Sequence, residues 1–454
     1  MTRALDLAQA ALAAADGEQA EAVVQSEVSG FARFAASEVH QPTLIENDMV
    51  ELRVVRDGRV AGAVTNRTSA EALAELARRA REAAERAPRD PSFPGLAPPS
   101  EPPAVEGYDE RTASLAPEEQ AQLAREAIDA ARPFGLFGYV TSGVTEIAVA
   151  SSTGIAVSQR LTDASVLALA ADDTASGYAE QASARVADVN PAGAAREAAE
   201  KAAQTRGGQE IELGRYRAVL EPYAIAELLE YFALHSFSGL RVLEEASYFA
   251  GRIGERAFDS KVSLADDALD PVGLPKAFDF EGVPKHRVEL VTEGVLRGVV
   301  WDRATAARAG DGTQSTGHAV RAEDRSWGPQ ALAVSMAAGD AKSLEELAER
   351  VGDGIHVTRL HYLSVVSPRE GIVTGMTRDG TFRIRDGRRA EPLVNLRFTV
   401  SVPELLAEVP GLTRERKLVN RAQWYGDRYP YGYVVPGLAT ACFTVTGNGS
   451  APGL

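Results

Sequence analysis

Hydrophobic and polar residues alternate with a period of two along several stretches of the chain. The segment MVELRVVRDGRVAGAVTN contains two alternating runs that meet at Arg56-Asp57-Gly58, and TEIAVASSTGIAVSQR repeats this arrangement around Thr153-Gly154. Short breaks that contain glycine, placed between alternating runs, are typical of β-hairpins. The pattern therefore predicts two antiparallel hairpins in the first 200 residues.

Other stretches of the first half have helical spacing. Leu5, Ala8 and Leu12 recur on one face of the opening segment, and polar residues interrupt its apolar run, so the pattern favours an amphipathic helix over a signal peptide. Ser69 stands where it can cap a segment rich in Ala, Leu, Glu and Arg. The further predicted helices cover 69–86, 117–132 and a segment that begins at Asn190-Pro191 and ends near Gly207-Gly208.

The second half is richer in strand patterns. The segment HRVELVTEGVLRGVVWD predicts a long hairpin that turns at Glu293-Gly294, and further strands are predicted in GIHVTRLHYLSVV, GTFRIRDG, NLRFTV and ACFTVTG. Shorter helices are predicted over 223–235, 303–309, 343–351 and 402–409.

We therefore expect an α+β fold with two domains. The length and the glycine pair at 207–208 place the boundary there. Residues 1–208 are expected to form an N-terminal α/β domain with a mixed sheet and helices, interrupted by a Pro-rich loop over 87–107. Residues 209–454 are expected to form a strand-rich C-terminal domain with long antiparallel hairpins.

Composition excludes several classes of partner. The chain carries 64 acidic and 48 basic residues, for a formal net charge of -16, and this excess repels the phosphates of nucleic acid. No apolar run approaches the roughly 20 residues that cross a bilayer. Cys442 is the single cysteine, so an internal disulfide is excluded and a reducing compartment is favoured. We expect a cytoplasmic protein that binds neither nucleic acid nor a membrane.

A search for known catalytic motifs finds none. The six histidines form no His-Glu-x-x-His, and His356 and His361 lie five residues apart on a predicted strand, which directs them to opposite faces. No nucleophile elbow, P-loop or dinucleotide fingerprint is present. Cys442 lies in an apolar strand, where buried thiols are usually inert. The sequence predicts no metal site in this chain.

Polar clusters between the predicted strands of the second half each have two interpretations. Asp266, Asp267 and Asp270 are typical turn formers, and Asp379-Gly380 is typical of a tight turn. Asp279 and Glu281 alternate on a predicted extended segment and face the same way, which suits acid–base chemistry, a bound cation or a solvated edge. The candidates for a substrate channel are Asp279, Glu281, His318, Tyr362, Arg378 and Asp379, with His361 beside them.

The order of motifs after about residue 210 is specific. RYRAVLEP, LHSFSG, DDALDP, FDFEGVP, STGHAV, HYLSVV, TGMTRDGTFRIRDG and NLRFTVS follow one another. This order resembles the C-terminal domain of the TldD/PmbA (modulator of DNA gyrase) peptidase family, and the first 200 residues resemble the family more weakly. The resemblance implies two subunit types with one fold. TldD-type chains carry His-Glu-x-x-x-His on a helix and a cysteine near the C-terminus, and TldE/PmbA-type chains lack these zinc ligands.

The resemblance also places the metal helix at 228–236 of this sequence. The first histidine position holds Glu230, the glutamate position holds Tyr231, and His235 alone matches. Cys442 falls in the last predicted strand, and QWYGDRYPYGY replaces the loop that carries the family's cysteine. Two ligands and the general base are therefore missing. The resemblance implies no cofactor in this chain and zinc in a TldD-type partner.

Two functions remain open. In the first, the chain is a TldE/PmbA-like subunit of a heterodimeric metallopeptidase, non-catalytic by itself, that acts with a TldD-type subunit on extended peptides or peptide-like natural-product intermediates. Its candidate residues would then line a shared channel. In the second, the chain is a stand-alone hydrolase of a biosynthetic pathway that uses Glu230, His235 and His361. A partner subunit needs a heteromer, whereas a stand-alone enzyme acts as a homo-oligomer.

Overall fold

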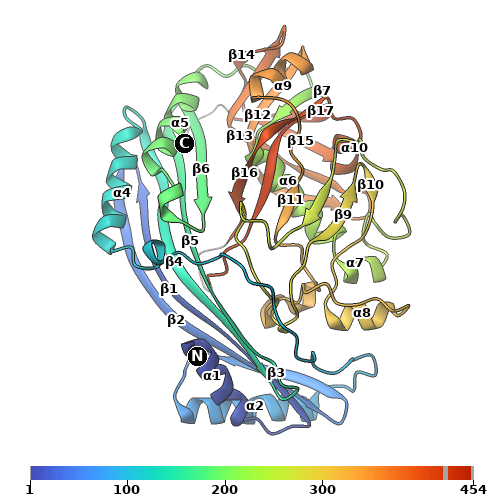
Figure 1. The fold of residues 1–454 in the computed structure, drawn as a ribbon. Helices are drawn as coiled ribbons and strands as arrows, with labels where there is room; N and C mark the ends of the chain where they lie inside the picture. Colours follow the sequence, from blue (N-terminus) through green and yellow to red (C-terminus); the bar gives the residue numbers. More distant parts are fainter. Residues whose placement is uncertain (1, 423–427, 451–454) are drawn as a thin grey trace.

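The computed structural model describes residues 2–422 and 428–450, which form two β-sheets with helices around them (Figure 1). The first sheet has the strand order β3-β2-β1-β4-β5-β6, and each of its pairings is antiparallel. Its strands are β1 (Gln19–Ala35), β2 (Glu38–Arg56), β3 (Arg59–Thr65), β4 (Gly135–Ser151), β5 (Ala156–Asp172) and β6 (Ala175–Ser183).

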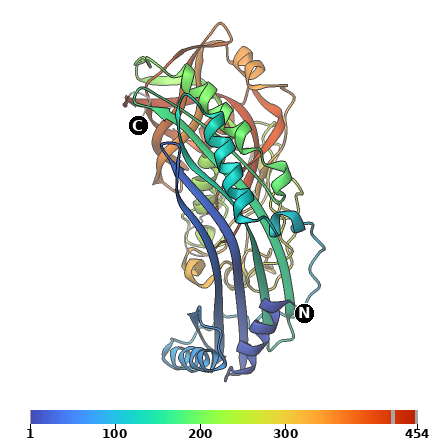
Figure 2. The ribbon, with the colours of Figure 1, turned by 90° about the vertical axis from the view of Figure 1, so that its left-hand side faces the viewer.

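Four helices cover the outer face of this sheet. Helices α4 (Pro117–Ala130) and α5 (Pro191–Gln204) lie at one end, and α1 (Arg3–Ala13) and α2 (Ala70–Arg86) lie at the other (Figures 1 and 2). Successive side chains on these strands point to opposite faces of the sheet. Even-numbered residues of β1, such as Ala22 and Val24, pack with the helices, whereas Val23 packs with residues of the second half of the chain.

The second sheet is mixed. It has eleven strands in the order β10-β9-β8-β11-β17-β15-β13-β12-β7, with β14 paired to β13 and β16 paired to β17. The pairings β7–β12 and β11–β17 are parallel, and the others are antiparallel. Its strands are β7 (Gly214–Leu220), β8 (Leu264–Asp266), β9 (Val288–Thr292), β10 (Val295–Leu296), β11 (Val334–Met336), β12 (Gly354–Ser367), β13 (Ile372–Arg385), β14 (Arg388–Pro392), β15 (Leu396–Ser401), β16 (Gly411–Asn420) and β17 (Gly432–Asn448).

Helix α6 (Pro222–Ser236) packs against this sheet, next to β12, β16 and β17. Its apolar residues, including Leu228, Leu229 and Phe232, are buried in the largest core cluster. The shorter helices are α3 (Glu110–Ala113), α7 (Gly239–Leu243), α8 (Arg303–Ala309), α9 (Leu344–Val351) and α10 (Val402–Ala407), with 3-10 turns η1 (Val186–Asp188) and η2 (Ala322–Trp327). No helix in the described part of the chain is long and apolar enough to span a membrane.

The predicted α+β class is confirmed, and so are several local predictions. The hairpin turns at 56–58 and 153–154 are present. Ser69 accepts a hydrogen bond from the amide of Ala72 as the predicted cap of α2, and Asn190 does the same for Gly193 of α5. These features were predictable because neighbouring residues determine them.

Two predictions about strands are wrong in detail. The N-terminal sheet is antiparallel throughout, and the mixed sheet is the C-terminal one. The hairpin that turns at Glu293-Gly294 is short, because β10 ends at Leu296. After that point Val299 and Val300 are buried in the core, and Val300 forms an isolated bridge with Ser238 beside α7. The alternating pattern of this segment reflects packing of a buried loop.

Glycine allows β6 to lie close to α5. A Cβ atom at Gly177 would lie 2.2 Å from the carbonyl oxygen of Ala198 and 2.3 Å from the amide nitrogen of Ala202, both on the helix backbone. We therefore expect Gly177→Ala to lower the free energy of unfolding by about 2 kcal/mol, as overpacking in a core does. Urea unfolding measures this change. Gly298→Ala is the matched control, because its Cβ would meet nothing nearer than 3.5 Å; equal losses in both variants would contradict the close-packing account.

Candidate functional site

Helix α6 carries a stripe of partly exposed residues on an otherwise buried surface. Glu227, Glu230, Tyr231 and Leu234 are only partly buried, whereas most of the helix lies in the core. Their spacing of three and four residues places them on one face of the helix. This face therefore presents two carboxylates to whatever packs against it.

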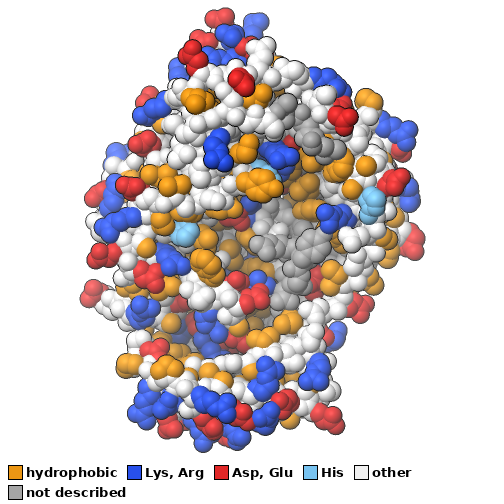
Figure 3. All heavy atoms as spheres, turned by 180° about the vertical axis from the view of Figure 1, so that it is seen from behind, with side chains coloured by type: hydrophobic (Ala, Val, Ile, Leu, Met, Phe, Trp, Pro, Cys, Tyr) orange, Lys and Arg blue, Asp and Glu red, His pale blue; other side chains and the backbone are white. Residues whose placement is uncertain are grey.

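The stripe borders a large cavity, here called the main cavity. The cavity has a volume of about 530 Å³, and Glu230, Tyr231 and Leu234 line it from α6. A cavity of this size holds a small molecule or a short stretch of peptide. From the side opposite to that of Figure 1, the molecule is hollowed near its centre, with hydrophobic side chains along the hollow (Figure 3).

An ion pair forms part of the cavity wall. Arg421, which follows β16, donates from Nε to Oε2 of Glu230 at 2.8 Å, and its Nη2 contacts the same oxygen. The hydroxyl of Tyr431 donates to Oε1 of Glu230 at 3.3 Å. Burial works against the charge of Arg421, but the attraction of Glu230 and Glu227 outweighs it and raises the pKa of the guanidinium. The carboxylate of Glu230 is therefore already neutralised by a cation of the protein.

A smaller cavity of about 210 Å³ is also lined by Arg421. It is lined by Glu227, Arg359 and Arg421 from the second half of the chain and by Tyr178 and Glu180 from β6. Burial raises the pKa of Glu227 to about 7, although Arg421 and Arg359 oppose this shift. The sequence analysis did not identify Glu227 or Arg421. The signal available for Glu227 was its spacing of three residues from Glu230 on an apolar helix.

The structure does not bring the three predicted catalytic residues together. Glu230 lines the main cavity, but His235 lies further along α6 and is not among the described residues of its wall. His361 lies on β12, with its ring centroid 4.1 Å from that of Tyr362. Burial lowers the pKa of both histidines, with further contributions from Arg241 at His235 and from Arg359 at His361. No interaction in the described structure joins the three side chains.

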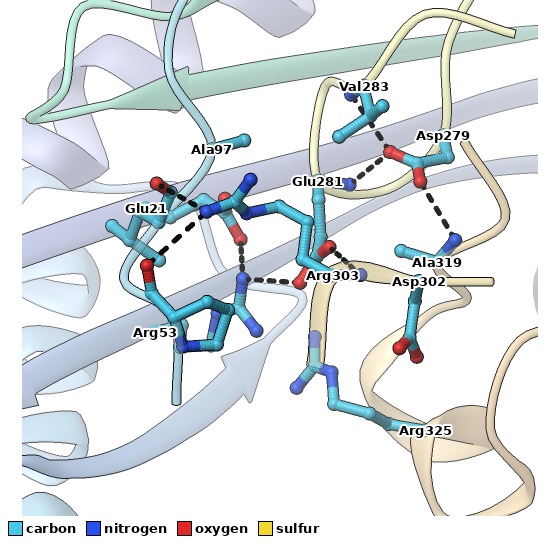
Figure 4. Close-up of polar contacts among 12 residues, drawn as sticks. Glu21, Arg53, Ala97, Asp279, Glu281, Val283, Asp302, Arg303, Ala319 and Arg325 are labelled. Carbon is cyan, nitrogen blue, oxygen red and sulfur yellow. Dashed lines mark hydrogen bonds and ion pairs between the residues drawn. The ribbon is translucent and has the colours of Figure 1, made fainter. Parts of the chain in front are cut away.

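The predicted pair Asp279 and Glu281 belongs to a tight turn, so the expectation of an extended segment is wrong. Oδ1 of Asp279 accepts hydrogen bonds from the amides of Glu281 at 2.9 Å and Val283 at 3.0 Å (Figure 4). Its Oδ2 accepts from the amide of Ala319 at 2.8 Å. The two carboxylates therefore serve different partners. Phe280, between them, lines the main cavity.

Glu281 joins a buried charge network between the two sheets. Nη2 of Arg53 on β2 lies 3.1 Å from Oε1 of Glu281 and 2.8 Å from Oε1 of Glu21 on β1 (Figure 4). Arg325 of η2 contacts Glu51 of β2 at 2.7 Å. Burial raises the pKa of Glu21 to about 7 against the attraction of Arg53. The network connects residues that lie more than 200 positions apart.

His318 is buried and paired with Asp266. Its Nε2 lies 2.8 Å from Oδ1 of Asp266, and its Nδ1 lies 2.9 Å from the hydroxyl of Thr316. Asp266 is on β8, so the prediction of a turn residue is wrong for it, whereas Asp267 and Asp270 accept hydrogen bonds from amides two residues later, as turn formers do. Burial opposes the charge of Asp266, but His318 outweighs this and lowers the pKa of the carboxyl to about 2.

The remaining channel candidates lie on β12 and β13. Asp379 and Gly380 have positive φ angles inside β13, where the pairing with β12 shifts, so the predicted tight turn is a bulge in a strand. Asp379 is buried, and Nε of Arg359 donates to its Oδ2 at 2.6 Å. Arg378 is half-buried, and Tyr362 is 74% exposed. None of the predicted channel residues is among the described residues that line either cavity.

The residues of α6 at the positions where the family resemblance places metal ligands do not fit a metal ion. Glu230 is bound by Arg421, and Tyr231 offers a phenol whose pKa burial raises. Within residues 2–422 and 428–450, no group of three or more His, Cys, Asp or Glu side chains could hold a metal. Cys442 is a buried free thiol on β17. Part of the segment QWYGDRYPYGY lies outside the described residues.

Comparison with known proteins gives a consistent result over the chain. Three family models match: PmbA/TldA metallopeptidase domain 1 over residues 20–84, the central domain over 110–206, and the C-terminal domain over 213–447. An uncharacterised protein of Methanocaldococcus jannaschii is 36% identical over 104 residues, which are 23% of this chain and 24% of that protein. A protein named metalloprotease from Methanothermobacter thermautotrophicus is 27% identical over 224 residues, 49% of this chain. The match spans 48% of that relative, about half of its length.

Solved structures show the same fold over nearly the whole chain. TldE from Thermococcus kodakarensis superimposes with a TM-score of 0.85 and 21% identity, over 97% of this chain and 99% of that one. A proposed modulator of a DNA gyrase from Thermotoga maritima gives a TM-score of 0.81 and 20% identity, over 94% and 96% of the two chains. At these identities the similarity establishes the fold alone.

The arrangement around Glu230 predicts that the purified chain holds no stoichiometric zinc. A second cation beside Glu230 would be repelled by the guanidinium of Arg421, and too few ligands are at hand. Elemental analysis of protein purified without a metal-affinity tag measures this. One zinc per chain that is lost in His235→Ala and kept in the control His40→Ala, an exposed histidine, would overturn the prediction.

The buried network predicts a pH-dependent stability. The pKa of Glu21 is about 7 in the folded chain against an ordinary 4.5, so the folded state binds the extra proton and loses stability as the pH rises through about 7. Glu21→Gln cannot ionise. Its stability relative to the unaltered chain should therefore rise between about pH 5 and pH 8, on the order of 2 kcal/mol. Urea unfolding of both proteins at the two pH values measures this, and an unchanged difference would contradict the role of Glu21.

Proposed function

Because the chain belongs to the PmbA/TldD metallopeptidase family, we propose that it is a TldE-like subunit that is not a zinc peptidase by itself. In this proposal it holds extended peptides, or peptide-like natural-product intermediates, for a TldD-type subunit that carries the zinc. The observation that supports this most is the Glu230–Arg421 ion pair. The guanidinium of Arg421 binds Glu230, the residue at which the family resemblance expects the first histidine of the metal motif.

The chemistry of the cavity supports a binding role. Peptide hydrolysis needs an activated water and stabilisation of the charge that develops on the carbonyl oxygen. Tyr231 stands where the family resemblance expects the general base, and a phenol whose pKa is raised stays protonated and is a poor base at neutral pH. The cavity nevertheless keeps a volume of about 530 Å³ beside this helix. A cavity that is retained without its catalytic set suits a subunit that binds substrate.

The first sheet offers a surface for pairing with another chain. Strand β3 pairs with β2 from Val50 to Arg56, so residues 38–49 of β2 have β1 as their only described neighbour in the sheet. Uncovered strand edges pair readily with a partner strand or an extended peptide. This edge is therefore a candidate contact with the TldD-type subunit.

The alternative function, a stand-alone hydrolase, lacks an assembled site. Its residues Glu230, His235 and His361 lie on different surfaces of α6 and on β12, and Glu230 is bound by Arg421. No geometry in the described residues favours a stand-alone hydrolase over a TldE-like subunit.

Mixing the chain with a TldD-type subunit tests the proposal. We expect peptidase activity toward an unfolded protein substrate that neither subunit shows alone, together with co-elution of the two chains. The activity should be lost when the first histidine of the partner's metal helix is replaced by alanine. It should remain within about fivefold in Glu230→Gln of this chain, because loss of one polar contact in a binding wall costs on the order of 1 kcal/mol.

The proposal would be overturned if activity depended on Glu230 of this chain and not on the partner's metal ligands. If Glu230→Gln abolished turnover while the partner's metal ligands were dispensable, the stand-alone enzyme would be the correct description. Glu227→Gln is the matched control for Glu230→Gln. It makes the same chemical change on the same face of α6, but Glu227 lines the smaller cavity and not the main cavity.

A further inference from the structure

The wall of the main cavity is unusually aromatic. Six of the fifteen described residues that line it are aromatic, although Phe, Trp and Tyr make up 6% of the chain. The six are Tyr231, Phe280, Trp327, Tyr429, Tyr431 and Tyr433. They come from four separate segments, so a single local sequence bias does not account for the cluster.

Three of these aromatic side chains belong to one short sequence motif. In YPYGY, Tyr429, Tyr431 and Tyr433 alternate with Pro430 and Gly432 where the chain enters β17. Alternate residues of an extended segment face the same side, and all three tyrosines line the cavity. Gly432 is required between them, because a Cβ there would lie 2.5 Å from the carbonyl oxygen of Val419 on β16.

The rings divide into a buried set and a partly open set. Phe280 and Tyr429 are buried with ring centroids 5.1 Å apart, and Tyr433 is buried with its hydroxyl donating to the carbonyl of Ala331 at 3.0 Å. Tyr231 and Tyr431 are half-buried, and Trp327 is 45% exposed. The hydroxyls of Tyr431 and Tyr433 are bound within the protein, so these residues offer ring surface to a ligand.

The acidic and basic side chains that line the main cavity are equal in number. Glu230 faces Arg421, and Asp324 accepts from Nη2 of Arg321 at 3.1 Å, which gives two acids and two bases among the described lining residues. A cavity without excess charge gives no advantage to an anionic or cationic group, even though the whole chain carries -16. Aromatic rings prefer offset or edge-to-face contacts with other rings.

We propose that this cavity selects the aromatic side chain of a bound peptide, or an equivalent uncharged aromatic ring of a peptide-like intermediate. The proposal deepens the proposed function, since it names the group that the substrate-holding subunit recognises. Tyr231, Tyr431 and Trp327 contact the entering ring, and Phe280, Tyr429 and Tyr433 form the buried surface behind it. The Glu230–Arg421 pair fixes the position of Tyr431 through its hydroxyl.

Titration with four blocked tripeptides tests the proposal. The peptides are acetyl-Ala-X-Ala-amides in which X is phenylalanine, cyclohexylalanine, lysine or glutamate. Cyclohexylalanine matches phenylalanine in size but has no aromatic ring. We expect the phenylalanine peptide to bind about tenfold more tightly than the charged peptides and several-fold more tightly than the cyclohexylalanine peptide. Calorimetry measures the dissociation constants, for the chain alone and for its complex with a TldD-type subunit whose metal helix is disabled.

Matched variants assign the preference to the cavity. Tyr431→Ala and Tyr231→Ala should weaken binding of the phenylalanine peptide about tenfold, whereas Tyr431→Phe keeps the ring, loses only the contact of its hydroxyl with Glu230, and should bind the peptide several-fold more tightly than Tyr431→Ala. Tyr108→Ala is the control, because Tyr108 lies outside the cavity wall and contacts Glu110 and Arg160. Thermal unfolding of each variant shows whether it is folded.

Three outcomes would overturn the proposal. They are equal affinity for the phenylalanine and cyclohexylalanine peptides, no measurable binding at millimolar concentration with or without the partner, and equal effects of Tyr431→Ala and Tyr108→Ala. Failure here is distinguishable from failure of the subunit function. If mixing restores peptidase activity but no aromatic preference is found, the proposed subunit function stands and the proposed selectivity is wrong. If an aromatic preference is found but mixing restores no activity, the selectivity stands and the proposed subunit function is wrong.

Discussion

The ion pair between Glu230 and Arg421 determines the shape and the chemistry of the central region. It joins α6 to the residue that follows β16, and Arg421 lines both cavities. The two side chains are 25% and 21% exposed, and removal of either leaves a charge that is largely shielded from water. The same pair holds the hydroxyl of Tyr431 and so orients one ring of the aromatic wall. A single interaction thus neutralises Glu230 and forms part of the wall of the main cavity.

The second organising feature is the charge network between the sheets. The inner face of β1 and β2 carries Glu21, Glu51 and Arg53, which are buried. Arg53 contacts Glu281 (Figure 4), and Glu51 contacts Arg325, both in the second half of the chain. Buried charges need such partners, since an unpaired charge in a dry interior is costly. The network therefore fixes how the first sheet sits against the second half of the chain, and with it the position of the cavity.

Local features of the fold were predictable from the sequence, and the site was not. The turns at 56–58 and 153–154 and the caps Ser69 and Asn190 depend on adjacent residues. Strand β1 is hard to recognise in the sequence because its buried inner face carries the polar residues Glu21, Gln25 and Glu27, which mask the alternation of a buried strand.

Contacts in and around the site join residues that lie far apart in the sequence. Asp266 meets His318 52 residues later, and Arg421 meets Glu230 at a separation of 191. The composition of one segment does not reveal such pairs. The family resemblance predicted that the helix of Glu230 lacks metal ligands, but the cation bound to Glu230 emerged only from the structure.

A double-mutant cycle on Glu230 and Arg421 tests the central claim most directly. Unfolding free energies and partner-supported turnover are measured for the unaltered chain, Glu230→Gln, Arg421→Gln and the double variant. If the pair is structural, each single change is destabilising, the coupling energy is about 1–3 kcal/mol, and the double variant keeps turnover with the partner. A coupling energy near zero, with turnover lost in Glu230→Gln and in the double variant alike, would contradict the account and identify Glu230 as a catalytic group.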